Sequence, residues 1–299
     1  MTSDHPEADP AADSPASPHR FRYARVLSIA GSDSGGGAGI QADLKTFSAL
    51  GCYGMTAITA ITAQNTRGVS AIHGVPPEVL RAQMHAVLDD IGADALKIGM
   101  LHSPEVVGVV AQALDDYRIA HVVLDPVMVA TSGDRLMAHD TVQVMVQELF
   151  PRATLVTPNL DEAALLLGRP ITHAAEFDAA ASDLVALGAP AVLLKGGHLA
   201  GNEIVDVLAT RDGLAERWAT PRIASENVHG TGCTLSSAIA AHLALGAGLP
   251  EAVAASRQYV LAAIAAGATV RTGAGHGPLN HAHAPRVMQR VPLGGRGLR

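Results

Sequence analysis

The sequence predicts a three-layer αβα sandwich with a mostly parallel central sheet. Short β-branched runs alternate with longer Ala- and Leu-rich segments along the chain. The strand candidates are almost continuously apolar, which is typical of parallel strands covered by helices on both faces. The chain has 299 residues, of which 48% are hydrophobic, so a single α/β domain could bury a large core.

The predicted strands are short runs of Val, Ile, Leu and Ala. The first spans 26–30 and precedes a glycine-rich turn. The next strands, in chain order, are 55–61, 95–98, 121–124, 154–156 and 191–194. Segments 204–208 and 217–219 follow one another without an intervening helix, so we expect an antiparallel pair at one edge of the sheet.

Helices are predicted between these strands. Residues 76–91 begin with proline and repeat apolar side chains at helical spacing, which favours a helix with proline in its first turn. The other predicted helices are 38–50, 161–167, 174–187, 234–245 and 251–266.

Composition also predicts the limits of the folded domain. Residues 1–20 are rich in Pro, Ala, Ser and Asp, so they bury too little apolar surface to offset the entropy of ordering and are expected to form a disordered tail. Residues 286–299, rich in glycine near the end, are expected to be a flexible C-terminal tail. No linker of this kind interrupts 21–285, which is predicted to be one domain.

Charge and cysteine content exclude several classes of protein. The net charge of −7 and the lack of a basic stripe argue against a nucleic-acid partner. No run of 18 apolar residues predicts a membrane span, and the N-terminus lacks the pattern of a secretory signal. Cys52 and Cys233 lie far apart without metal-ligand spacing, so we expect free thiols in a cytoplasmic protein.

Ligands of such sheets bind beyond the carboxyl ends of the strands, so residues that follow each strand are the first candidates. Residues 31–43 read GSDSGGGAGIQAD, and their glycines would let the backbone approach a ligand, or simply form a tight turn. The amide of Gln64 could offer one donor and one acceptor to a heterocycle, or belong to a solvated loop.

Acids, an amide and a lysine follow the later strands. Asp125 and Glu162 could hold Mg²⁺ directly or through water, as hard oxygen ligands do. Asn159 and Asp161 could equally cap a helix. Lys195 is one of only three lysines, and its ammonium could bind phosphate at a strand end.

The sharpest local pattern is HGTGCT at 229–234, followed by a predicted helix. Two glycines separated by one residue would point successive backbone N–H groups from a helix N-terminus, which forms an anion site. The same field would lower the pKa of Cys233. A glycine-rich turn with a small buried cysteine is the alternative. His281 and His283, near the C-terminus, are expected to be solvated.

Taken in order, these segments resemble the hydroxymethylpyrimidine/phosphomethylpyrimidine kinases of thiamine biosynthesis, a family with the ribokinase-like fold. The resemblance covers about residues 25–282. It departs from the family at Ser34, where many members have proline, and in the N-terminal tail. The matching segments are 29–33 with 36–46, 63–68, 97–101, 125–128, 157–159, 195–198 and 229–234.

The resemblance implies phosphorylation of 4-amino-5-hydroxymethyl-2-methylpyrimidine and then of its monophosphate, with ATP and Mg²⁺, in a homodimer. It implies contacts to the pyrimidine from Gln64, Asp43, Gly31, Ala38, Met100 and Val127. It implies that Gly230, Thr231 and Gly232 form an anion hole for the transferring phosphoryl group, with Cys233 as the base. It implies that Asn159, Lys195 and Thr231 bind the nucleotide and that Glu162 and Asp125 serve the metal ion.

Three other functions are weighed against this one. Pyridoxal kinase activity would use the same fold, but Gln64 suits the paired donor and acceptor of an aminopyrimidine better than a pyridine. A non-catalytic regulator that binds a nucleotide or a thiamine precursor would not need Cys233 beside an anion site. A redox role for Cys233 would call for a nearby resolving cysteine, which the sequence lacks.

Overall fold

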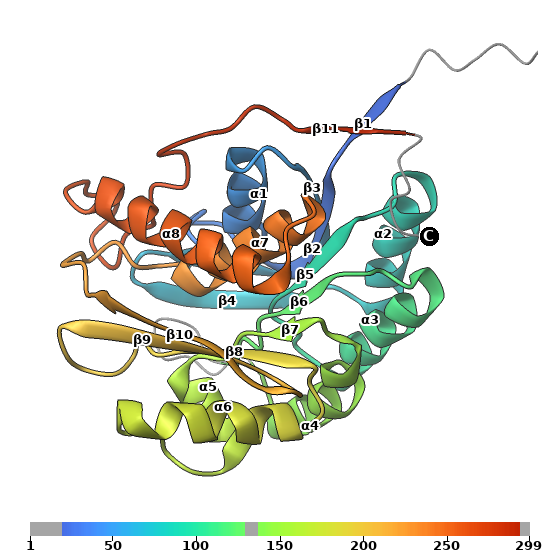
Figure 1. Ribbon diagram of the computed structural model, residues 1–299. Coiled ribbons are helices and arrows are strands. Elements are labelled where there is room, and N and C mark those ends of the chain that lie inside the picture. Colours follow the sequence, from blue (N-terminus) through green and yellow to red (C-terminus); the bar gives the residue numbers. More distant parts are fainter. Residues whose placement is uncertain (1–19, 129–136, 294–299) are drawn as a thin grey trace, which may run out of the picture.

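The computed structural model describes residues 20–128 and 137–293. Their centre is a nine-stranded sheet (Figure 1). The strands from β8 to β3 run parallel to one another, and β10, β9 and β4 are antiparallel to their neighbours. In sheet order they are β10 (Gly213–Pro221), β9 (Glu203–Thr210), β8 (Ala191–Lys195), β7 (Leu155–Val156), β6 (Val122–Leu124), β5 (Ala95–Ile98), β2 (Arg25–Asp33), β3 (Tyr53–Asn65) and β4 (Gly68–Gly74).

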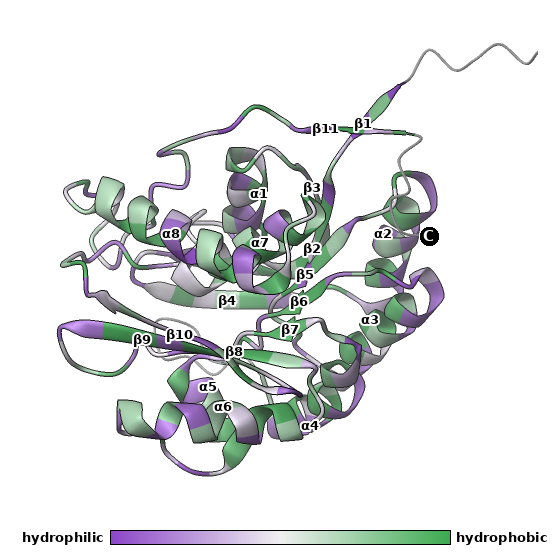
Figure 2. Ribbon diagram, viewed as in Figure 1, coloured by the Kyte–Doolittle hydropathy of each residue, from purple (hydrophilic) through white to green (hydrophobic). Residues whose placement is uncertain are grey.

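Helices cover both faces of the sheet, which confirms the predicted three-layer fold. Alternate side chains of the central strands enter the two hydrophobic cores, as Leu96 and Ala95 of β5 do, so these strands are mostly apolar on both faces. Figure 2 shows this as mainly hydrophobic colour on the central strands. One face carries α1 (Gly39–Ala49), α7 (Thr231–Ala244) and α8 (Leu249–Gly267); the other carries α2 (Pro77–Asp90), α3 (Pro104–Tyr117), α4 (His139–Glu148), α5 (Leu160–Leu167) and α6 (Phe177–Ala186).

Every predicted strand is present within a few residues, and β9 and β10 form the expected antiparallel edge. Among the strands of the nine-stranded sheet and the α-helices that cover it, β4, α3 and α4 were not predicted. The polar stretch 62–68 is not a loop, because β3 continues to Asn65 and turns directly into β4. Helix α7 begins at Thr231, three residues before its predicted start, because Gly230 is its N-cap and Gly232 lies in its first turn.

The C-terminal tail differs from its prediction between residues 286 and 293. Strand β11 (Arg290–Pro292) pairs with β1 (Phe21–Tyr23), and Arg286 N–H donates to Ala49 O at 2.8 Å. These backbone bonds anchor a segment whose composition alone suggests flexibility. Residues 1–19 and 294–299, which hold the rest of both predicted tails, lie outside the described residues.

Within the two described ranges, every helix is too short or too polar to span a bilayer.

Candidate active site

A cavity of about 550 Å³ opens beyond the carboxyl ends of the parallel strands. It lies where β2 has β3 on one side and β5 on the other, so that successive connections leave in opposite directions. Most residues singled out from the sequence line it: Gly31, Ala38, Gln64, Met100, Asp125, Val127, Asn159, Glu162, Lys195, Gly230, Thr231, Gly232 and Cys233.

Asp43 is the exception, and its predicted contact with the substrate needs correction. Among the described residues Asp43 is not part of the cavity lining, and it is fully buried in α1. Its carboxylate accepts hydrogen bonds from Ser28 Oγ at 2.5 Å and Ser237 Oγ at 2.7 Å. Both of its oxygens lie 3.0 Å from Lys97 Nζ. Lys97 reaches the cavity in place of Asp43.

Two helices begin at the cavity, and in both the residue at the N-cap position has no side chain that caps the first backbone N–H groups. Helix α7 follows Gly230, and helix α1 follows Ala38. Unpaired amides and the helix dipole make such N-termini favourable for an anion. Gly230 has φ +85°, and a Cβ there would lie 1.8 Å from Gly37 O. The anion loop (residues 229–232) and the glycine-rich loop (residues 31–38) therefore pack directly against each other.

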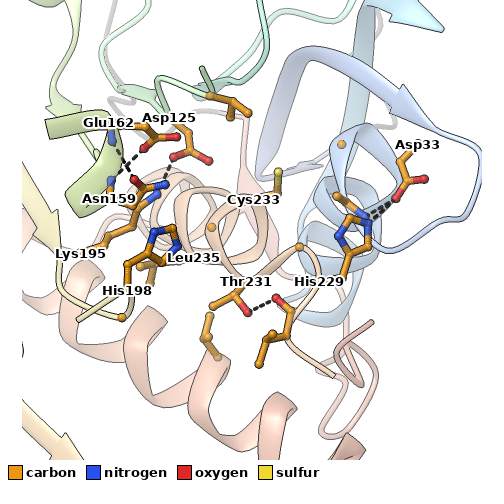
Figure 3. A pocket seen from close by; sticks show the side chains of 18 of the residues that line it. Asp33, Asp125, Asn159, Glu162, Lys195, His198, His229, Thr231, Cys233 and Leu235 are labelled. Carbon is orange, nitrogen blue, oxygen red and sulfur yellow. Dashed lines mark hydrogen bonds and ion pairs between the residues drawn. The ribbon is translucent and has the colours of Figure 1, made fainter. Parts of the chain in front are cut away.

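Cys233 lies in the first turn of α7, between two groups of polar residues (Figure 3). Burial raises the pKa of its thiol to about 11, against the opposing charge of Lys97, and Asp43 and Asp125 raise it further. The predicted lowering of this pKa is therefore wrong. A helix N-terminus favours the thiolate, but the loss of hydration outweighs it here.

On one side of Cys233, a lysine and an acid form a nearly buried ion pair. Lys195 Nζ lies 2.8 Å from Asp125 Oδ1, and Thr157 Oγ1 donates to the same oxygen at 3.1 Å. Burial alone would raise the pKa of Asp125, but Lys195 and Lys97 hold it below its usual value. Asp125 is thus ionised at neutral pH, and it lies beside the anion loop.

Glu162 and Asn159 form a capping box at the start of α5. Asn159 N–H donates to Glu162 Oε2 at 2.8 Å, and Glu162 N–H donates to Asn159 Oδ1 at 2.9 Å. The capping interpretation of Asn159 is therefore correct as geometry, and Asn159 still lines the cavity. Burial raises the pKa of Glu162 to about 7, with the charge of Asp125 adding to the rise and Lys195 opposing it.

These carboxylates suit Mg²⁺ only with help from a ligand. In the described part of the chain, no three His, Cys, Asp or Glu side chains converge to hold a metal ion. Mg²⁺ keeps several waters and usually takes one or two protein carboxylates together with phosphate oxygens. A raised pKa at Glu162 beside Asp125 is the condition that a nearby divalent cation relieves. The residues present therefore fit an ion held through water and phosphate.

Glu162→Gln is expected to flatten the dependence of stability on pH. The pKa of Glu162 is about 7 in the folded protein and near 4.5 when unfolded, so the folded state binds more protons between these values. The free energy of unfolding of the wild type then falls as pH rises through this window, by on the order of 1–3 kcal/mol. Glutamine cannot ionise, yet it still accepts the bond from Asn159 N–H.

Urea unfolding of the wild type and Glu162→Gln at pH 5 and pH 8, without Mg²⁺, measures this contribution. A fall in stability of the same size in both proteins would contradict the raised pKa.

The structure adds residues that the sequence did not single out. The apolar side chains of Ile204, Val260, Leu261 and Ile264 also line the cavity. Beside them, Asp206 accepts bonds from Arg257 Nε at 2.7 Å and from Gly196 N–H at 3.0 Å. These contacts tie α8 and β9 to the turn after Lys195, and they depend on tertiary pairing that no local pattern reveals.

His281 is buried, contrary to its predicted solvation. Its Nε2 lies 3.0 Å from Thr234 Oγ1, which in turn donates to Gly230 O at 2.8 Å. Burial lowers the pKa of His281 to about 4, so it is neutral at physiological pH. A neutral imidazole thus supports the start of α7 from behind.

Comparison with known proteins gives consistent relatives over nearly the whole described chain. The family model described as phosphomethylpyrimidine kinase matches residues 33–280. A hydroxymethylpyrimidine/phosphomethylpyrimidine kinase from Rhizobium meliloti is 54% identical over 259 residues, which is 86% of this chain and 97% of the relative.

Two solved structures show the same likeness in three dimensions. A phosphomethylpyrimidine kinase from Clostridium difficile has a TM-score of 0.70 and 42% identity, and the match covers 79% of this chain and 97% of the other. A pyridoxal kinase from Staphylococcus aureus, in complex with AMP-PCP, has a TM-score of 0.80 and 34% identity, and the match covers 89% and 96%. The backbone thus resembles both kinds of kinase.

Proposed function

Because the chain belongs to the phosphomethylpyrimidine kinase family, we propose that it phosphorylates 4-amino-5-hydroxymethyl-2-methylpyrimidine with ATP, and then its monophosphate, in thiamine biosynthesis. One observation carries this proposal furthest. The uncapped N-terminus of α7, with Cys233 in its first turn, opens into the same cavity as Gln64. A group that could recognise a heterocycle and a group that could stabilise a transferring phosphoryl thus share one chamber.

The pyrimidine is proposed to lie between the glycine-rich loop and Gln64. Thr62 Oγ1 donates to Gln64 Oε1 at 3.2 Å, which orients the amide. A Cβ at Gly31 would lie 2.8 Å from Met100 Cε, so a side chain there would displace Met100 from its place in the cavity wall. Ala38 and Val127 complete an apolar wall that would exclude water from the reacting hydroxymethyl group.

In the first transfer the hydroxymethyl oxygen attacks the γ-phosphorus in line. The amides of Gly230, Thr231 and Gly232 would stabilise charge on the equatorial oxygens, where fixed donors act most strongly. Cys233 is proposed to take the hydroxyl proton in its thiolate form. Since burial raises the pKa of this thiol to about 11, the thiolate is a minor species at neutral pH and the first step should accelerate as pH rises.

The phosphates of ATP are proposed to contact Lys195, Asn159 and Thr231. A bound Mg²⁺ would neutralise charge on the β- and γ-phosphates, and Asp125 and Glu162 would accept hydrogen bonds from its waters. In the second transfer the phosphate of the monophosphate is the nucleophile. It is already anionic near pH 7, so it needs little help from a base.

The release of ADP tests this function against its rivals. We expect ADP from Mg-ATP and the aminopyrimidine at a higher kcat/KM than from Mg-ATP and pyridoxal in a parallel assay. Release of ADP with pyridoxal but not with the aminopyrimidine would favour the pyridoxal kinase activity that the S. aureus relative suggests. Binding of the pyrimidine without ADP release would favour a regulator. The homodimer stays a prediction, which analytical ultracentrifugation tests.

A further inference from the structure

The glycine-rich loop and the anion loop are joined by a buried hydrogen bond that the proposed mechanism does not use. Asp33 ends β2, and His229 precedes Gly230 at a separation of 196 residues. His229 Nε2 lies 3.0 Å from Asp33 Oδ2, and the two residues are 8% and 2% exposed. Figure 3 shows the two side chains pointing toward each other, on the opposite side of Cys233 from Asp125 and Glu162.

Asp33 organises the glycine-rich loop. Its Oδ1 accepts from Gly35 N–H at 2.8 Å, and its Oδ2 accepts from Gly37 N–H at 3.0 Å and Ala38 N–H at 2.8 Å. Burial alone would raise the pKa of Asp33, but the bonds from His229, Ala38 and Gly35 hold it below its usual value. The group is therefore a carboxylate that only accepts, so His229 must donate through Nε2–H.

His229 is anchored at the start of the anion loop. Its backbone N–H donates to Gly277 O at 3.1 Å, which fixes the approach to Gly230. A Cβ on Gly37 would lie 2.5 Å from His229 Cδ2. The imidazole is thus enclosed by the loop that Asp33 holds, and moving either loop displaces the other.

We propose that Asp33 and His229 are positioning residues for phosphoryl transfer: their hydrogen bond fixes the anion loop against the glycine-rich loop. The Asp33–His229 latch would hold the amides of residues 230–232 at the distance that the transferring phosphoryl requires. This role rests on the proposed function. Misplacing catalytic donors by about 1 Å can cost on the order of 100-fold in rate, so a bond outside the phosphoryl site can control the chemistry.

His229→Leu, which keeps volume and removes the donor, tests the latch. We expect kcat to fall roughly 10- to 100-fold for both transfers, with the Kd for Mg-ADP within about 2-fold of wild type. The affinity for Mg-ADP with aluminium fluoride and the pyrimidine, which mimics the transferring phosphoryl, should fall in step with kcat. His229→Gln can donate from its amide and should recover part of both losses. The exposed His139→Ala is the matched control.

Two results would contradict the positioning role of Asp33 and His229. One is an unchanged kcat in His229→Leu; the other is an equal loss of affinity for Mg-ADP and for the aluminium fluoride complex, which indicates general disruption. If His229→Leu does not fold, Asp33→Asn replaces it in the same titration. Where His229→Leu folds, the hydrogen bond is also measured without catalysis, because the Tm shifts of Asp33→Asn, His229→Leu and the double variant must be non-additive. A wild type inactive on the pyrimidine would count only against the proposed function.

Discussion

Gly230→Ala is expected to lower kcat/KM for both phosphoryl transfers by about 10²–10³-fold, the loss typical of a missing oxyanion donor. Two features of this position combine. The residue has φ +85°, which disfavours any L side chain, and its Cβ would lie 1.8 Å from Gly37 O. The anion loop must therefore move away from the glycine-rich loop, and its amides move with it. Steady-state kinetics with each pyrimidine substrate measures the loss.

Gly168→Ala is the matched control for this variant. Gly168 has φ +67° at the end of α5, and in the described part of the chain no heavy atom lies within 4 Å of its added Cβ. It carries the same kind of backbone strain, about 1–2 kcal/mol, without the clash. We expect a lower Tm and nearly unchanged kinetics. Similar kinetic losses in both variants would show that strain, and not the position of the anion loop, controls the rate.

Cys233→Ala is expected to slow the first phosphorylation by about 10²–10⁴-fold, the usual contribution of a general base, and the second by much less. A hydroxyl must lose a proton to attack, whereas a phosphate is already an anion near pH 7. Since burial raises the pKa of this thiol to about 11, the wild-type first step should also rise with pH. The variant should lose that dependence. Single-turnover rates for each step from pH 6.5 to 9 measure both effects.

Cys52→Ala is the control for Cys233→Ala, because it removes a thiol that lies elsewhere in the protein. Cys52 is buried in the core between α1 and α7, away from the cavity lining, and burial raises the pKa of its thiol to about 12. Its replacement should lower stability slightly and leave the ratio of the two steps unchanged. Equal losses in both steps of Cys233→Ala would rule out its proposed role as a base for the hydroxymethyl group.

Local patterns predicted much of this fold and site, because the parallel strands and the turns that follow them are written in consecutive residues. The anion loop is one such case, with its glycines and helix start adjacent in the chain. The misses have a tertiary origin. The placement of Asp43 depends on Lys97 and Ser237, and β11 pairs with β1 at the other end of the chain.

The pKa of Cys233 also depends on tertiary contacts that the sequence does not show. The helix N-terminus at Cys233 is visible in the sequence, whereas its burial among Asp43, Asp125 and Lys97 is not, and burial decides the direction of the pKa. The bond between Asp33 and His229 likewise joins residues 196 positions apart.

Mass spectrometry of the products formed from the aminopyrimidine and Mg-ATP labelled with ¹⁸O in the γ-phosphoryl group tests the central claim most directly. The account predicts a labelled monophosphate that appears first and a diphosphate, labelled in both phosphoryl groups, that accumulates as the monophosphate declines. A folded wild-type protein that yields no labelled pyrimidine at any time would contradict it.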